Sequence, residues 1–140
     1  MGSRFHEQVM GVYFDDLDAF QILHNARYLL LFERTLGSFW QEVGLGAFDT
    51  AGNTDHLHLV AHNSVDYLEP VRGVGRVRVR VGVDALGRSS LTFRFAVMPM
   101  DRDVDHARGK RVIVRVDPAT QRPAPWSDDF RGRLASWVDA

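Results

Sequence analysis

Apolar residues follow a helical spacing in one long stretch of the chain, residues 24–43. Side chains three or four positions apart form an apolar face there, made of Tyr28, Phe32, Leu36, Phe39, Trp40 and Val43. Leucines at positions 29–31 extend this surface around the first turns, as in a helix that is buried. Asn25 is the predicted N-cap of this helix and Gly44 its predicted C-terminal stop.

Strand patterns lie on both sides of this helix. Residues 9–14 are an apolar run and residues 57–68 a long extended run. Residues 76–81 and 91–97 alternate apolar with polar side chains, and residues 112–116 predict a last strand. Leu86-Gly87-Arg88 predicts the turn between the alternating strands, and residues 128–138 predict a short C-terminal helix. The order predicts one α+β domain over residues 1–140, with one antiparallel sheet and one principal helix.

Composition narrows the class of protein. The chain has 140 residues, of which 45% are hydrophobic and 25% charged, and 17 basic against 18 acidic side chains give a net charge of −1. This balance argues against a nucleic-acid partner. The absence of cysteine excludes disulfides and a thiol nucleophile and fits a reducing compartment. The longest apolar run, residues 28–32, is too short to span a membrane. We therefore expect a cytoplasmic protein.

Three carboxylates, Asp15, Asp16 and Asp18, immediately precede the predicted helix. A helix N-terminus presents unpaired N–H groups that can bind a carbonyl oxygen as it gains negative charge. Asp18 lies seven residues before Asn25 and could attack the same carbonyl or activate a water molecule. A thioester suits this arrangement, because a thiol with a pKa of roughly 8.5 leaves readily as thiolate. A turn or capping role for Asp18 is the alternative, and Asp15 and Asp16 are interpreted as solvated or hydrogen-bonded loop residues.

Several short motifs follow one another along nearly the whole chain. They are Asp16-Leu17-Asp18-Ala19-Phe20, His24-Asn25-Ala26-Arg27-Tyr28, Phe32-Glu33-Arg34, Val65-Asp66-Tyr67-Leu68-Glu69-Pro70, Leu86-Gly87-Arg88-Ser89-Ser90 and residues 116–123. Their order resembles the hotdog-fold thioesterases of the 4-hydroxybenzoyl-CoA thioesterase superfamily. The resemblance implies a hotdog fold, with one curved antiparallel sheet wrapped around a long central helix. It also implies hydrolysis of acyl-CoA to the free acid and CoA, with no cofactor.

The same resemblance implies roles for individual residues. Asp18 would be the catalytic residue, and the backbone N–H of Asn25 would polarise the thioester carbonyl. The segment Arg88-Ser89-Ser90 would lie near the pantetheine and nucleotide end of CoA. Tyr13 is interpreted as a wall of the core or of the substrate pocket. His24 is either a polar group of the active site or a local cap partner, and relatives often carry a glycine where this chain has Gln21.

Two other functions are compatible with the same motifs. The chain could release acyl groups from an acyl carrier protein, or it could bind acyl-CoA without catalysis; the carboxylate of Asp18 favours an enzyme. A single sheet with open edges predicts a homodimer or homotetramer. In relatives the substrate channel follows the contact between subunits, so the resemblance implies that Asp18 of one subunit faces Asn25 of the other.

Two further patterns are weaker. His56 and His58, with Asp55 and His62 nearby, have a spacing that could bind zinc, but no convincing further ligand completes a set. We expect surface or interface histidines and no metal. Arg76, Arg78 and Arg80 form a row on one strand, which predicts a solvated face or, alternatively, attraction for the phosphates of CoA.

Overall fold

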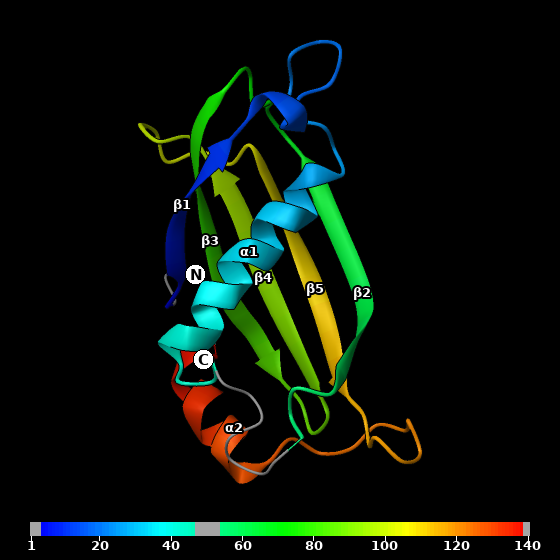
Figure 1. The fold of residues 1–140 in the computed structure, drawn as a ribbon. Helices are drawn as coiled ribbons and strands as arrows, with labels where there is room; N and C mark the ends of the chain where they lie inside the picture. The colour runs from blue at the N-terminus through cyan, green and yellow to red at the C-terminus, as the bar shows by residue number, and fades with distance from the viewer. Residues whose placement is uncertain (1–3, 47–53, 139–140) are drawn as a thin grey trace.

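The computed structural model describes residues 4–46 and 54–138. Within them the chain forms five strands and four helical segments: β1 (His6–Val12), η1 (Phe14–Asp16), α1 (Arg27–Glu42), β2 (His58–Tyr67), β3 (Gly75–Leu86), β4 (Ser90–Met98), β5 (Ala107–Arg115), α2 (Asp128–Leu134) and η2 (Ala135–Trp137). The strands make one antiparallel sheet in the order β1-β3-β4-β5-β2. Helix α1 crosses one face of this sheet (Figure 1). The predicted α+β class is confirmed.

Alternation along β3 and β4 decides which face of the sheet is covered. The apolar members of both strands are buried against α1: Val77, Val79, Val81, Val83, Leu91, Phe93, Phe95 and Val97. Phe32 of α1 stacks on Phe95 with ring centroids 4.6 Å apart and meets the edge of Phe93 at 6.0 Å. The predicted period of two is confirmed, because the residues in between, among them Arg78, Arg80 and Arg94, lie on the other face.

Helix α1 begins later than the predicted range, residues 24–43. The first helical residue is Arg27, and Ala26, which makes no side-chain cap bond, occupies the N-cap position. The predicted Asn25 cap is therefore wrong. The reason is tertiary, since the backbone N–H of His24 donates to Asp16 O at 2.9 Å and holds this segment in the preceding loop. The predicted end of the helix agrees closely with the observed one, because Gly44 has φ +83° just beyond the last turn.

The C-terminal segment covers the far end of α1, as Figure 1 shows. Ser127 accepts a hydrogen bond from Phe130 N at 3.1 Å, which caps α2, and donates to the buried carboxylate of Asp55 at 2.6 Å. Trp126 stacks on Phe130 at 4.1 Å. The predicted short C-terminal helix is confirmed, and the loop that carries Asp18 lies at the opposite end of α1.

Strand β2 forms an open edge of the sheet. It pairs with β5 on one side, and no strand in the described part of the chain pairs with its other side. Large apolar side chains at both ends of β2 are about half exposed: Leu59 59%, Val60 49%, Tyr67 53% and Leu68 49%. An exposed apolar edge of this length is a surface on which another strand can pair.

Candidate active site

Asp18 lies in a tight loop between β1 and α1, which we call the Asp18 loop (residues 13–26). The chain reverses there, with Leu17 paired to Leu23 and Asp18 N donating to Ile22 O at 2.8 Å. Asp18 Oδ1 accepts hydrogen bonds from Phe20 N at 2.8 Å and from Ile22 N at 3.2 Å. Within residues 4–46 and 54–138, no donor is within hydrogen-bond distance of Oδ2. Asp18 therefore has the turn role through Oδ1, and its Oδ2 is left available for chemistry.

The tip of the Asp18 loop requires a left-handed backbone. Gln21 has φ +62°, a conformation that glycine adopts at little cost and that other residues adopt at roughly 1–2 kcal/mol. The loop is held in this shape from both sides, since Gln21 N donates to Asp18 O at 3.0 Å and Gly73 N donates to Gln21 O at 2.9 Å. Where relatives often carry a glycine, this chain therefore holds Gln21 in a strained backbone conformation.

We expect Gln21→Gly to raise the free energy of unfolding by about 0.5–1 kcal/mol, because it relieves the left-handed strain but loosens the unfolded chain. Urea unfolding measures the change. Gln41→Gly is the matched control, since Gln41 lies in α1 and its replacement should destabilise by about 1 kcal/mol. A loss of stability in Gln21→Gly as large as that in the control would contradict the argument.

Asp16 is a buried structural carboxylate that holds the Asp18 loop on α1. Its Oδ2 accepts from Tyr13 N at 2.8 Å, and its Oδ1 pairs with Arg27 Nη1 at 3.3 Å. Arg27 Nη2 also donates to Asp15 O at 3.1 Å. The interpretation of Asp16 as a hydrogen-bonded loop residue is confirmed, and its two oxygens are already occupied.

Asn25 offers an unpaired backbone donor where the loop enters α1. Arg27 N donates to His24 O at 2.9 Å and Ala26 N donates to His24 Nδ1 at 3.1 Å. Within the described ranges, no acceptor lies within hydrogen-bond distance of the Asn25 N–H. His24 therefore acts here as a local cap partner, the second of its two predicted roles. The unpaired N–H lies on the same loop as the free oxygen of Asp18.

Two tyrosines to which the sequence assigned no role in the site lie beside this turn. Tyr67 Oη donates to the Asn25 carbonyl oxygen at 3.0 Å, and its ring meets Tyr28 edge-on at 5.1 Å. Burial raises the pKa of the Tyr28 hydroxyl, against a smaller opposite effect of a hydrogen bond from the Val71 backbone. Tyr28 therefore stays protonated near neutral pH. Tyr67 lies in the motif Val65-Asp66-Tyr67-Leu68-Glu69-Pro70, which could have pointed to it as a residue of the site.

Three exposed aromatic residues belong to the same loop as Asp18. Tyr13, Phe14 and Phe20 are 61%, 76% and 82% exposed. The Tyr13 ring lies across Gly11, where a Cβ atom would approach ring carbon Cζ to 2.6 Å. Of the two interpretations of Tyr13, the core position is wrong, because the loop turns its ring outward, and the wall of the substrate pocket stays a prediction. The three exposed rings lie before and after Asp18 along the loop.

The segment Arg88-Ser89-Ser90 lies at the other end of the sheet from Asp18. It forms the turn between β3 and β4, near α2 (Figure 1). Trp126 N donates to Arg88 O and Trp126 Nε1 donates to Ser90 O, both at 3.0 Å. Within one chain, the structure does not bring this segment together with Asp18.

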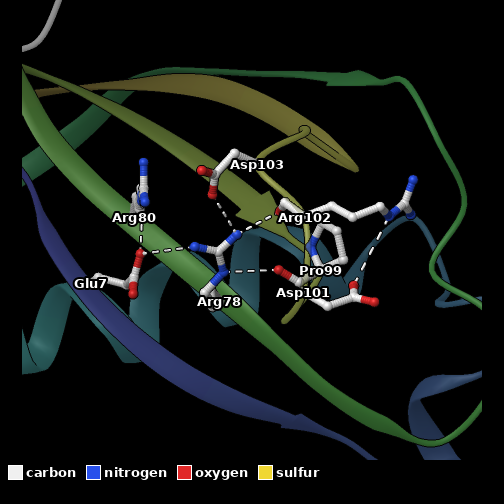
Figure 2. A network of polar contacts seen from close by, with 7 residues as sticks. All are labelled: Glu7, Arg78, Arg80, Pro99, Asp101, Arg102 and Asp103. Carbon is white, nitrogen blue, oxygen red and sulfur yellow. Dashed lines mark hydrogen bonds and ion pairs between the residues drawn. The ribbon is translucent and has the colours of Figure 1, made fainter.

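The arginine row on β3 is largely neutralised by nearby acids. Arg78 pairs with Glu7 at 3.9 Å and with Asp103 at 3.0 Å, and Arg80 pairs with Glu7 at 2.7 Å. Figure 2 shows this network, in which Arg78 also donates to the backbone oxygens of Pro99 and Arg102. Arg78 and Arg80 thus join β1 and the β4–β5 loop to β3, which favours a structural role over attraction for phosphate.

The histidines considered for zinc are placed apart from any ligand cluster. The carboxylate of Asp55 accepts from Ser127 N at 2.9 Å, besides the Ser127 hydroxyl. The His58 ring packs against Trp40 and Trp126 at 6.2 and 6.3 Å, and burial lowers its pKa. In the described part of the chain, no three His, Asp or Glu side chains are grouped so that they could hold a metal ion.

Comparison with known proteins gives the superfamily of the chain. The sequence model of the thioesterase-like superfamily matches residues 12–134, so the chain belongs to this superfamily. The uncharacterized protein YsmA of Bacillus subtilis (strain 168) is 24% identical over 125 residues, which cover 89% of this chain and 82% of YsmA.

Two solved structures extend the comparison. A thioesterase from Thermus thermophilus, solved in complex with coenzyme A and Zn, is 28% identical with a TM-score of 0.78, covering 94% of this chain and 92% of that one. The PA5185 protein of Pseudomonas aeruginosa strain PAO1 is 26% identical with a TM-score of 0.81, covering 96% and 92%. Together with the superfamily match, they identify a hotdog-type thioesterase fold and support thioesterase activity in general. Among the described helices, none is long and apolar enough to cross a membrane.

Proposed function

We propose that this protein hydrolyses acyl-CoA thioesters to the free acid and CoA. One observation carries the proposal: Asp18 is anchored through Oδ1 while Oδ2 stays free, on the loop that also presents the unpaired Asn25 N–H. The exposed rings of Tyr13, Phe14 and Phe20, on the same loop, could contact an acyl group. The coenzyme A bound to the Thermus thermophilus thioesterase supports CoA as the thiol portion of the substrate.

The chemistry needs one carboxylate and one oxyanion donor. The Asn25 N–H binds the thioester oxygen and stabilises the negative charge that develops there. Asp18 Oδ2 either attacks the carbonyl carbon or removes a proton from an attacking water molecule. The C–S bond then breaks and CoA leaves as thiolate, so that one water is consumed for each acid and thiol formed. In the direct path, water hydrolyses the intermediate anhydride on Asp18.

A panel of acyl-CoA and acyl-carrier substrates tests this proposal, with the released thiol measured by a thiol-reactive dye. We expect release from CoA esters. Release from carrier-bound acyl groups alone would favour a thioesterase of carrier proteins, and binding without release would favour a non-catalytic acyl-CoA-binding protein. Variation of the acyl chain in the panel identifies the preferred acid.

We also propose that α1 is the central helix of a hotdog dimer built across β2. The apolar ends of β2, Leu59-Val60 and Tyr67-Leu68, flank a polar centre. Antiparallel pairing of two β2 edges would bring the Leu59-Val60 end of each chain against the Tyr67-Leu68 end of the other. This pairing would cover the exposed apolar side chains and join two sheets into one. A tetramer would require a further contact between such dimers.

The dimer also offers a place for Arg88-Ser89-Ser90. Leu59 and Ser90 lie in one row across the sheet, since both pair with Val114. Antiparallel pairing of β2 would therefore turn the Arg88-Ser90 end of the partner toward the Asp18 end of this chain. The substrate would then contact both subunits. The loop hydrogen bonds favour Asp18 and Asn25 of the same chain acting together, in place of Asp18 with Asn25 of the other subunit.

A further inference from the structure

One peptide group at the start of α1 is hydrogen-bonded by side chains at both of its ends. Tyr67 Oη donates to the Asn25 carbonyl oxygen at 3.0 Å, across 42 residues of sequence. The N–H of the same peptide group, on Ala26, donates to His24 Nδ1 at 3.1 Å. Because the oxygen and the N–H lie in one rigid plane and point in opposite directions, these two bonds fix how the plane is turned.

The preceding peptide group, between His24 and Asn25, is held in a different way. Its oxygen accepts from Arg27 N at 2.9 Å, within the first turn leading into α1. Both peptide planes beside the Asn25 Cα are therefore restrained. The Asn25 N–H remains the donor that these restraints leave unpaired, and its direction follows from them.

The bond to His24 defines the state of its ring. Nδ1 accepts a hydrogen bond from Ala26 N–H, so the proton of the neutral ring is on Nε2. An imidazolium, with protons on both nitrogens, could not accept this bond. An asparagine at position 24 could accept it, because its Oδ1 is separated from Cβ by the same number of bonds as Nδ1 of histidine.

Tyr67 is held in place for its role. Its ring packs edge-on against the buried Tyr28 at 5.1 Å, and it belongs to β2, the open edge of the sheet. The Tyr67 hydroxyl thus connects the edge on which a second copy would pair with the donor of the site. Neither Tyr67 nor His24 needs to touch the reacting atoms to act in this way.

We infer that Tyr67 and His24 are positioning residues that together orient the peptide group between Asn25 and Ala26. Through the Asn25 Cα, which joins this group to the preceding one, they help to aim the Asn25 N–H at the thioester oxygen. This inference rests on the proposed thioesterase function. Loss of one oxyanion-hole donor lowers turnover by about a hundredfold to a thousandfold. A donor that is misdirected but present should lower it less, by roughly tenfold.

The test compares Tyr67→Phe, His24→Ala and His24→Asn in the full-length protein. Tyr67→Phe keeps the ring contact with Tyr28 and loses only the hydrogen bond. We expect kcat to fall roughly tenfold in Tyr67→Phe and in His24→Ala, with KM changed less than twofold. His24→Asn should restore most of kcat. The double variant Tyr67→Phe/His24→Ala should be little worse than either single variant, because both bonds orient one peptide group.

Thr120→Val is the matched control, since it also removes one hydrogen bond between a side chain and the backbone, at 3.3 Å to Arg122 N, in a distant exposed turn. Its kcat should equal that of the wild type. Unchanged kcat in both Tyr67→Phe and His24→Ala would overturn the inference. A multiplicative loss in the double variant, or a loss equal in His24→Asn and His24→Ala, would do the same.

An NMR measurement separates this inference from the proposed function. We expect the amide signals of Asn25 and Ala26 to shift in Tyr67→Phe and in His24→Ala, and to stay close to the wild type in His24→Asn. If the wild type hydrolyses no thioester in the panel, the proposed function fails and these signals alone decide whether the two side chains orient Asn25. Unmoved signals would overturn the inference even where kcat falls.

Discussion

Replacing Asp18 with asparagine is expected to lower kcat by at least about a thousandfold and to leave the fold intact. Asparagine keeps an Oδ1 that can accept from Phe20 N and Ile22 N, so the loop retains its shape. It loses the negative charge that Oδ2 would use for attack or for proton removal. A thousandfold loss corresponds to about 4 kcal/mol of transition-state stabilisation, the scale expected for an essential carboxylate.

Steady-state thiol release measures the loss, and circular dichroism with thermal unfolding confirms the fold. Asp15→Asn is the matched control, because Asp15 lies in the same loop on η1 and is exposed. Asp16→Asn should mainly lower stability, since its carboxylate holds Tyr13 N and Arg27. Near-normal turnover by a folded Asp18→Asn protein would show that another group does the chemistry.

Leu59→Asp and Leu68→Arg are each expected to convert the proposed dimer into monomers and to abolish most of the activity. Each would place a charge against an apolar side chain of the second copy when two β2 strands pair antiparallel. An equimolar mixture should form heterodimers. In them the aspartate of one chain would meet the arginine of the other, and Leu68 of the first chain would meet Leu59 of the second.

Gel filtration with light scattering measures assembly, and thiol release measures activity in the same samples. The wild type should elute as a dimer or tetramer, each variant as a monomer, and the mixture as a dimer with activity restored to roughly half or more of the wild type. Val9→Asp is the control, an exposed valine of β1, which lies at the opposite edge of the sheet from β2. A monomeric and active wild type would refute the dimer, and two variants that remain dimeric would place the contact elsewhere.

Sequence reasoning succeeded where the determining residues are close together in the chain. The alternation of β3 and β4 predicted their buried faces, because successive side chains of a strand point to opposite sides. It failed at the start of α1, which was predicted at residue 24 and begins at Arg27. The hydrogen bond from His24 N to Asp16 O removes that residue from the helix, and no local pattern contains this bond.

By itself, the sequence of this protein determined the fold class, the order of its strands and helices, and Asp18 as the carboxylate before the principal helix. These follow from periodicity, from turn residues and from the order of short motifs, all of which act over a few positions. Only the tertiary structure decided which oxygen of Asp18 is free, that Asn25 does not cap α1, and that Tyr67 reaches Asn25. Those facts depend on hydrogen bonds between segments that the packing of α1 on the sheet brings together, such as the bond across 42 residues from Tyr67 to Asn25.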